Sequence, residues 1–94
     1  MRLVSWEVEE IKKAAKLVFG ENVKVILFGS RVDDSKKGGD IDLYVITDNP
    51  SYKKKGEFWI ELQERLGEQK IDIILSEDSN RRIEQVALKE GVEL

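Results

Sequence analysis

The sequence predicts a small α/β or α+β domain in which a mixed β-sheet is backed by helices. Segments with the 3.6-residue apolar spacing of helices alternate with short runs rich in valine, isoleucine and leucine. Glycines and one proline stand at boundaries between these segments. The chain has 94 residues without a repeat or linker, so we expect one domain over residues 1–94. The expected order of elements is α-β-(short α)-β-α-β-α.

The first helix is expected to be capped by Ser5 and to end at Gly20. Its apolar residues recur at the i, i+3, i+4 and i+7 positions of one face: Ile11, Ala14, Ala15 and Val18. Residues 23–28, VKVILF, form a short, β-branched and apolar run that is typical of a buried strand. This strand runs directly into Gly29 and Ser30.

Two further strands and two further helices follow. A strand is expected at residues 40–46, DIDLYVI, and the sequence DNP marks its end. Residues 53–66 predict a helix with a glycine as its stop, and residues 70–75 predict a third strand. Ser79 is expected to open a last helix that ends at Gly91. The apolar residues of these two helices are Phe58, Trp59, Leu62 and Leu66 in the first, and Ile83, Val86 and Ala87 in the second.

The composition restricts the chemistry open to this domain. The chain contains no cysteine, which excludes disulfides, thiolate nucleophiles, cysteine zinc sites and iron–sulfur clusters. It contains no histidine, which excludes a Ser-His-Asp triad and imidazole metal ligands. Catalysis would therefore use carboxylates, lysine or arginine, hydroxyls, backbone amides and hard, oxygen-bound metals such as Mg²⁺.

The charge and hydropathy patterns indicate a soluble, cytoplasmic protein. A net charge of −3 argues against direct binding to duplex DNA. No apolar run is long enough to span a bilayer. The amino-terminal sequence, MRLVSWEVEE, becomes acidic at once and lacks the layout of a secretory signal.

Three aspartates fall within expected strands, where a charge is unfavourable unless it meets a metal or a partner. Asp40 and Asp42 are two residues apart, so their side chains leave the same face of a strand, and Asp72 has the same setting in the third strand. If these strands are neighbours, the three carboxylates converge, and divalent cations would relieve their repulsion. Taken singly, each site is more simply a turn or edge residue. The intervening residues then face the core: Ile41, Leu43, Val45, Ile71 and Ile73.

Gly29 and Ser30 follow a buried strand and precede residues 31–35, which could begin a helix. Glycine lets the backbone approach a ligand closely, and serine adds a hydroxyl to the amides at a helix start. This arrangement suits an anion such as a triphosphate. Most strand-Gly-Ser sequences are simple turns, so the pair gains meaning only together with the aspartates.

The remaining basic and aromatic residues indicate no site by themselves. The lysine run at residues 53–55 is more simply a solvated helix face than a contact with phosphates or RNA. Trp6 and Trp59 are expected to be core or rim aromatics. The glycine, the serine and the three aspartates are therefore the candidate site.

The segment LFGS-RVDDSKKGG-DIDLYV, with a further strand aspartate in KIDIIL, resembles the nucleotidyltransferase superfamily that includes DNA polymerase β. It is most similar to the small "minimal nucleotidyltransferase" branch, and the resemblance covers nearly the whole chain. The resemblance is specific, because Gly-Ser, Asp-x-Asp and a third aspartate occur in order on the expected strands. It implies the nucleotidyltransferase fold. It also implies transfer of a nucleoside monophosphate from ATP, or another nucleotide, to an acceptor hydroxyl, with release of pyrophosphate.

The resemblance implies a role for each matching residue. Gly29 and Ser30 match the turn that grips the phosphates. Asp40 and Asp42 match the pair that holds two Mg²⁺ ions, one of which also carries the phosphates of the nucleotide. Asp72 matches the third carboxylate of the metal site, which in the family can help to activate the attacking hydroxyl. Two metals stabilise both oxygens of an in-line displacement, so such an enzyme needs no histidine.

One part of the motif departs from the family. Many of these small proteins continue Gly-Ser with x-Ala-Arg-Gly, whereas this chain reads RVDD from Arg31 onward. An acid thus replaces a basic residue near the expected phosphates. Arg31 is the nearest basic residue and is included among the expected nucleotide-binding residues, with Lys36 and Lys37 as further positive charges.

The resemblance also implies a partner. In the minimal branch the partner is often a separately encoded helical protein of the HEPN class, an RNase toxin, and this chain would be its antitoxin. It would neutralise the toxin by adding AMP to a tyrosine or by binding. The chain is too short to hold a further acceptor-binding domain, so the partner is expected to supply the acceptor. Two alternatives stay open: a non-catalytic module that masks a partner, and an enzyme that modifies a small molecule, such as an aminoglycoside, together with a second subunit.

Overall fold

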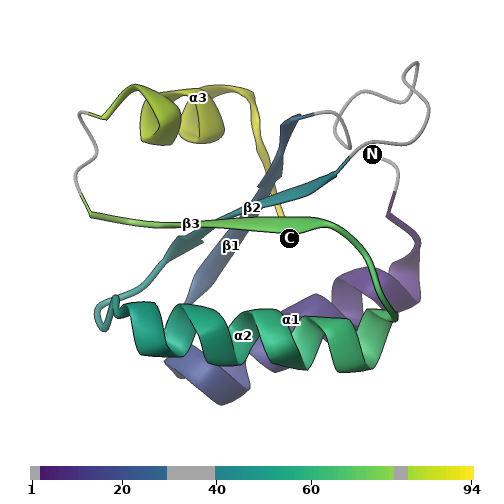
Figure 1. Ribbon diagram of the computed structural model, residues 1–94. Helices are drawn as coiled ribbons and strands as arrows, with labels where there is room; N and C mark the ends of the chain where they lie inside the picture. Colours follow the sequence, from purple (N-terminus) through teal and green to yellow (C-terminus); the bar gives the residue numbers. More distant parts are fainter. Residues whose placement is uncertain (1–2, 30–39, 78–80) are drawn as a thin grey trace.

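The structure is a computed structural model and describes residues 3–29, 40–77 and 81–94. In these residues a four-stranded sheet lies between α1 and α2 on one side and α3 on the other (Figure 1). The helices are α1 (Ser5–Phe19), α2 (Tyr52–Leu66) and α3 (Arg82–Glu90), and the strands are β1 (Lys24–Phe28), β2 (Ile41–Ile46), β3 (Ile71–Leu75) and β4 (Val92–Glu93). The predicted fold class, a small mixed sheet backed by helices, is confirmed.

The sheet has the strand order β3-β2-β1-β4. β1 pairs antiparallel with both β2 and β4, whereas β2 pairs parallel with β3. Parallel neighbours need a long crossover connection, and α2 supplies it. The second and third strands expected from the sequence are therefore neighbours, which is the condition for the aspartates to approach one another.

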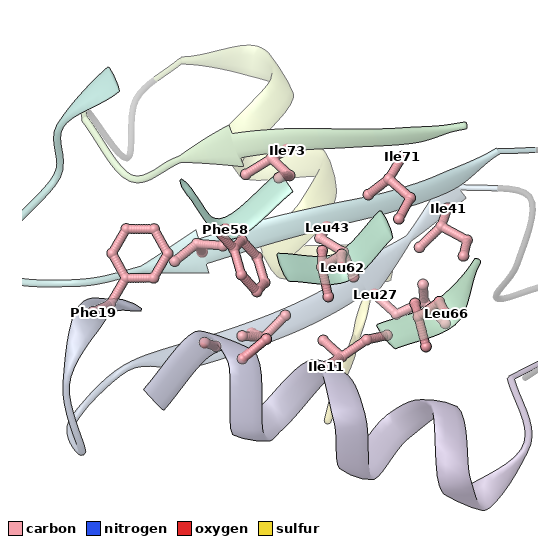
Figure 2. Close-up of a cluster of buried hydrophobic side chains, with 14 of the residues drawn as sticks. Ile11, Phe19, Leu27, Ile41, Leu43, Phe58, Leu62, Leu66, Ile71 and Ile73 are labelled. Carbon is pink, nitrogen blue, oxygen red and sulfur yellow. The ribbon is translucent and has the colours of Figure 1, made fainter. Parts of the chain in front are cut away.

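The main core lies between the sheet and the α1–α2 layer (Figure 2). Alternate residues of β2 face it, and Ile41, Leu43 and Val45 are fully buried as the alternation predicts. The rings of Phe19 and Phe58 meet edge to face, with centroids 5.6 Å apart. Because this core takes one face of every central strand, the other residues of β2 and β3 are left to the α3 side of the sheet.

A smaller core lies under α3 and contains a buried carboxylate. Glu84 is 0% exposed there. Tyr44 Oη donates a hydrogen bond to Glu84 Oε1 at 2.6 Å, and Arg81 Nε donates to Oε2 at 2.6 Å. Burial and the bond to Glu84 raise the pKa of Tyr44 to about 12, so the phenol stays a donor at neutral pH. This network fixes the start of α3 over β2. The other members of the smaller core are Ile26, Phe28 and Ala87.

The helix starts differ from those expected. Ser5 is the first residue of α1 and not its cap, so that prediction is wrong. The Val4 N–H donates instead to the Glu7 carboxylate at 3.0 Å, and a side chain inside the first turn thus satisfies the helix start. α2 begins one residue earlier than expected, because the Ser51 hydroxyl accepts from the backbone N–H of Lys54 at 3.1 Å. Both helices end at the expected glycines.

Several residues expected in the core are exposed. Trp59 is 44% exposed and lies outside the apolar stripe assigned to it. Trp6, which was expected in the core or at its rim, is 55% exposed on α1. In α3 the buried positions are Glu84 and Ala87, whereas Ile83 is 40% exposed. The paired carboxylate explains this rotation, because Glu84 occupies the inward position that an apolar pattern assigns to a hydrophobic residue. Val18 and Val86 are partly buried.

Some expected elements lie outside the described residues, and one element was not expected. Ser79 and the short helix at residues 31–35 lie outside the described ranges. β4 was missed because two residues, Val92–Glu93, are too few to show strand alternation. Within the described part of the chain, no helix has the length and apolar character needed to cross a membrane.

Gly91→Ala is expected to lower the free energy of unfolding by about 1–3 kcal/mol. A Cβ at Gly91 would overlap the Ile26 side chain and the Ala87 carbonyl, and would lie 3.0 Å from the Leu27 carbonyl oxygen. Gly56→Ala is the matched control, because it lies within α2 with nothing within 4 Å, and it is expected to stabilise by about 0.5–1 kcal/mol. Urea unfolding measures both, and an unchanged Gly91→Ala would contradict this packing.

Tyr44→Phe is expected to destabilise the fold by about 1–3 kcal/mol, because it removes a donor from the buried Glu84 carboxylate. Tyr52→Phe serves as the control. Its hydroxyl is on a side chain that is 75% exposed and makes only a 3.3 Å bond to Glu77, so we expect a change within about 0.5 kcal/mol. Thermal unfolding compares the two variants. Equal effects would show that the buried Tyr44–Glu84 hydrogen bond adds no more to stability than the exposed one.

Candidate active site

An open groove of about 590 Å³, here named the edge groove, runs along β3 where the sheet ends. Residues 71–74 of β3 form its floor. Lys55 and Trp59 of α2 border one side, and Ile83 of α3 borders the other. Asp42 and Asp72 lie at its polar end, beside Phe28. The groove therefore places two of the predicted site residues against an apolar surface that is open to a ligand.

Asp42 and Asp72 are brought together by strand register. They are direct partners in the parallel pair of β2 and β3, so their side chains leave the same face of the sheet. The Asp72 carboxyl lies close enough to Asp42 to raise the pKa of Asp42 through its charge and through side-chain hydrogen bonding. Burial, and then the charges of Asp72 and Asp40, raise the pKa of Asp42 from 3.8 to about 6. A proton or a cation between these two acidic groups would relieve their repulsion.

Asp40 stands slightly apart from this pair. It immediately precedes β2, and its Oδ2 lies 3.3 Å from Lys70 Nζ. Its charge still reaches Asp42, where it helps to raise the pKa. Across residues 3–29, 40–77 and 81–94, no three acidic side chains stand as a ready-made metal cage. The structure thus joins Asp42 with Asp72 and directs Asp40 toward Lys70, and the assignment of all three as metal ligands stays a prediction.

Gly29 follows β1 and lies against the Asp42 side chain. Its φ is +78°, a conformation that side-chain-bearing residues rarely adopt. A Cβ on Gly29 would overlap Oδ2 of Asp42 and lie 3.1 Å from its Cγ. Glycine is therefore required here both by the backbone and by the space that Asp42 occupies. Ser30 and Arg31 lie outside the described residues, so their nucleotide-binding roles stay predictions.

The chemistry of this donor set fits a hard divalent cation. Asp42 and Asp72 offer only carboxylate oxygens, which Mg²⁺ prefers. Mg²⁺ is commonly held by one or two carboxylates, with water and substrate phosphate oxygens completing its shell. Burial and then repulsion from Asp72 and Asp40 raise the pKa of Asp42, and such a cation would offset this repulsion. The residues present thus fit a magnesium site that is completed by its substrate.

Lys55 and Trp59 were not among the site residues expected from the sequence. They are four residues apart in α2, so they share one helix face. The core stripe of the same helix is Phe58, Leu62 and Leu66, also at spacings of four. Trp59 is one residue beyond this stripe and therefore lies at its border. The face of α2 that carries Lys55 and Trp59 could have been identified from the sequence. These two residues are four apart and lie beside an apolar stripe that is already complete.

In metal-free protein the contribution of Asp42 to stability is expected to fall as the pH rises from about 4 to about 6. The pKa of Asp42 is raised by folding, so the folded state binds the proton more tightly than the unfolded state in that interval. Asp42→Asn should remove this contribution and raise the melting temperature above pH 6. Asp48→Asn, at an exposed turn, should leave the pH profile of the wild type unchanged. Thermal unfolding with a chelator present measures all three proteins, and identical profiles for the wild type and Asp42→Asn would refute the coupling.

Comparison with protein families gives one match. The family described as "Polymerase beta, Nucleotidyltransferase" matches residues 9–94, which include every candidate site residue. Comparison with curated proteins finds no match. The family match covers nearly the whole chain and agrees with the mixed sheet that carries Asp42 and Asp72 on neighbouring strands. The chain therefore belongs to the polymerase β family of nucleotidyltransferases.

Proposed function

We propose that this protein is an Mg²⁺-dependent adenylyltransferase that moves AMP from ATP to a hydroxyl group of a partner protein. The observation that carries the proposal is the Asp42–Asp72 pair, which opens onto the edge groove in a nucleotidyltransferase chain. Gly29 supports it from the opposite side of Asp42, because only glycine leaves room for that carboxylate. A nucleotide and an acceptor can therefore approach the same pair of carboxylates from two sides.

Each candidate residue has a distinct role in this proposal. Asp42 and Asp72, with Asp40, would hold the two Mg²⁺ ions. Gly29 would let the backbone approach the triphosphate, and Ser30 and Arg31 would bind it. When bound, the cations neutralise charge on the phosphate oxygens and favour ionisation of the attacking hydroxyl. Lys70 Nζ lies 3.3 Å from Asp40 Oδ2 and so reduces the net negative charge around the carboxylates.

The proposed reaction is an in-line displacement at the α-phosphorus of ATP. The acceptor oxygen forms a bond to this phosphorus, and the bond from phosphorus to the oxygen that bridges to the β-phosphate breaks. Pyrophosphate leaves with that electron pair, and the AMP unit stays on the acceptor. The proton of the acceptor hydroxyl passes to the Asp72 carboxylate and then to water. Asp72 suits this role because it is exposed on the sheet edge beside the groove.

We propose further that the acceptor is a tyrosine of a helical HEPN-type RNase toxin, for which this chain is the antitoxin. The similarity of the Gly-Ser and Asp-x-Asp motifs to minimal nucleotidyltransferases supports this choice. The open edge groove also supports it, because Trp59 and Ile83 leave apolar area exposed beside the carboxylates. A protein partner could cover such a surface while presenting its hydroxyl.

Asp42→Asn and Asp72→Asn are each expected to lower AMP transfer by roughly a hundredfold or more, because each removes a charge that holds the metal. The assay incubates the protein with α-labelled ATP, Mg²⁺ and the proposed HEPN-type partner, here called the neighbour, and measures label on that partner. Asp48→Asn is the control, since it removes an exposed aspartate distant from the groove. Equal labelling by Asp42→Asn and the wild type would contradict the proposal.

Two other outcomes identify the alternatives. If the neighbour is neutralised equally well by the wild type and by Asp42→Asn, and receives no label, the chain is a non-catalytic binding module. If label reaches only an added small alcohol such as an aminoglycoside, the acceptor is a small molecule. Both outcomes would overturn the assignment of a protein acceptor.

A further inference from the structure

We propose that the free edge of β3 binds the acceptor as an added β-strand, so that the acceptor hydroxyl is carried by an extended peptide segment. The inference rests on the proposed transfer to a protein and specifies how that protein is recognised. β3 is the last strand of the order β3-β2-β1-β4. Figure 1 shows it at the front of the sheet, with α3 above and α2 below, and among the described residues no strand pairs with its outer side.

Two hydrogen bonds determine which backbone groups of β3 face this edge. The Ile41 N–H donates to the Lys70 carbonyl at 3.0 Å, and the Ser76 N–H donates to the Val45 carbonyl at 2.9 Å. The bonded backbone groups of Lys70 and Ser76, which flank β3, therefore point toward β2. The backbone groups of Asp72 and Ile74, at the alternate positions between them, point the same way. The N–H and C=O groups of Ile71 and Ile73 consequently point away from β2, toward the free edge.

A third hydrogen bond agrees with this assignment of outward-facing backbone groups and marks where the free edge ends. Leu75 has the same parity as Ile71 and Ile73, and its carbonyl accepts a hydrogen bond from Arg81 Nη2 at 3.2 Å. Arg81 is thus a cap on the carboxyl end of the edge. The remaining stretch of this edge runs from Ile71 to Ile73, which are 5% and 4% exposed and line the groove, and it leads directly to the candidate carboxylates.

The hollows beside this edge could accommodate the side chains of an added strand. A second hollow shares Trp59 and is also lined by Gln63 and Lys70, so the surface beside α2 continues toward the residue that precedes β3. Five residues of extended chain span about 17 Å. Trp59 on one side and Ile83 on the other would cover the side chains of the added strand, which alternate between the two sides.

The occupant follows from the spacing of the backbone groups. Donors and acceptors at alternate residues are matched by another extended peptide backbone, whereas a small alcohol offers no such repeat. Natural sheets protect long edges with lysine, proline or a covering element, and β3 (IDIIL) contains neither of these residues. Asp72 lies on the α3 side of the sheet with Asp42, so the reacting hydroxyl comes from a residue of the added strand that faces α3.

The test uses a library of nonapeptides with a central tyrosine, α-labelled ATP and Mg²⁺. The best labelled peptide is then remade with a single N-methyl group at each backbone position in turn. Within this series of singly methylated peptides, those methylated at alternate positions are expected to be labelled about tenfold less or lower still, because only alternate N–H groups face β3. Methylation at the intervening positions is expected to change it by less than about twofold.

Amide hydrogen exchange supplies a readout that does not depend on catalysis. Saturating peptide should slow exchange at Ile71 and Ile73 by about tenfold or more, while Ile74, whose N–H faces β2, stays unchanged. Trp59→Ala should lower peptide labelling by about tenfold. Trp6→Ala is the matched control, because Trp6 is an exposed tryptophan of α1 that does not line the groove, and its labelling should equal that of the wild type.

The outcomes separate this inference from the function on which it rests. Labelling that is indifferent to the position of the N-methyl group, or unchanged exchange at Ile71 and Ile73 with saturating peptide, would overturn edge binding while leaving transfer to a protein intact. Label that reaches only small alcohols would overturn both the peptide acceptor and the protein acceptor. Failure to label any acceptor, with no pyrophosphate released, would overturn the proposed function and this inference with it.

Discussion

The parallel pairing of β2 with β3 is the constraint on which the site depends. It places Asp42 directly beside Asp72, and burial, followed by the charges of Asp72 and Asp40, raises the pKa of Asp42 to about 6. Parallel strands require the α2 crossover, and α2 also carries Lys55 and Trp59 to the same edge. This one pairing therefore accounts for three features: the Asp42–Asp72 pair, the position of Trp59 beside it, and the free edge of β3. A shift of the β2–β3 register by one residue would place the two aspartates on opposite faces of the sheet, with one of them turned into the main core, and would separate the acidic pair.

The two faces of the sheet are used differently. The α1–α2 face holds only apolar side chains from the central strands, and its packing supplies most of the buried area. The α3 face carries every charged group that enters a strand, and Glu84 is stabilised there by Tyr44 and Arg81. Separating the faces lets the protein keep a strongly polar site without interrupting its main core.

The strands and their inward residues could be predicted from the sequence because two-residue alternation leaves little choice of face. Leu43 and Ile73 had to face the core, which left Asp42 and Asp72 on the other side. The exposure of Trp59 and the burial of Glu84 could not be predicted in the same way. Each depends on partners distant in sequence, such as Tyr44 for Glu84. The spacing of apolar residues along a helix predicts only which positions are hydrophobic and does not identify such partners. The approach of Gly29 to Asp42 was equally hidden, since it is a contact between two strands rather than a pattern in one.

The cap that Arg81 places on the Leu75 carbonyl limits how tightly the edge can hold anything by itself. Only Ile71 and Ile73 then offer a full set of outward backbone groups, and each hydrogen bond contributes about 0.5–1.5 kcal/mol net. Association of two molecules costs about 4–15 kcal/mol in lost freedom. A strand on this edge would therefore dwell only briefly unless the rest of its protein were anchored elsewhere, where tethering would raise its effective concentration to the millimolar range. Such an arrangement favours rapid release of each modified segment and makes turnover, rather than tight capture, the natural behaviour of the complex.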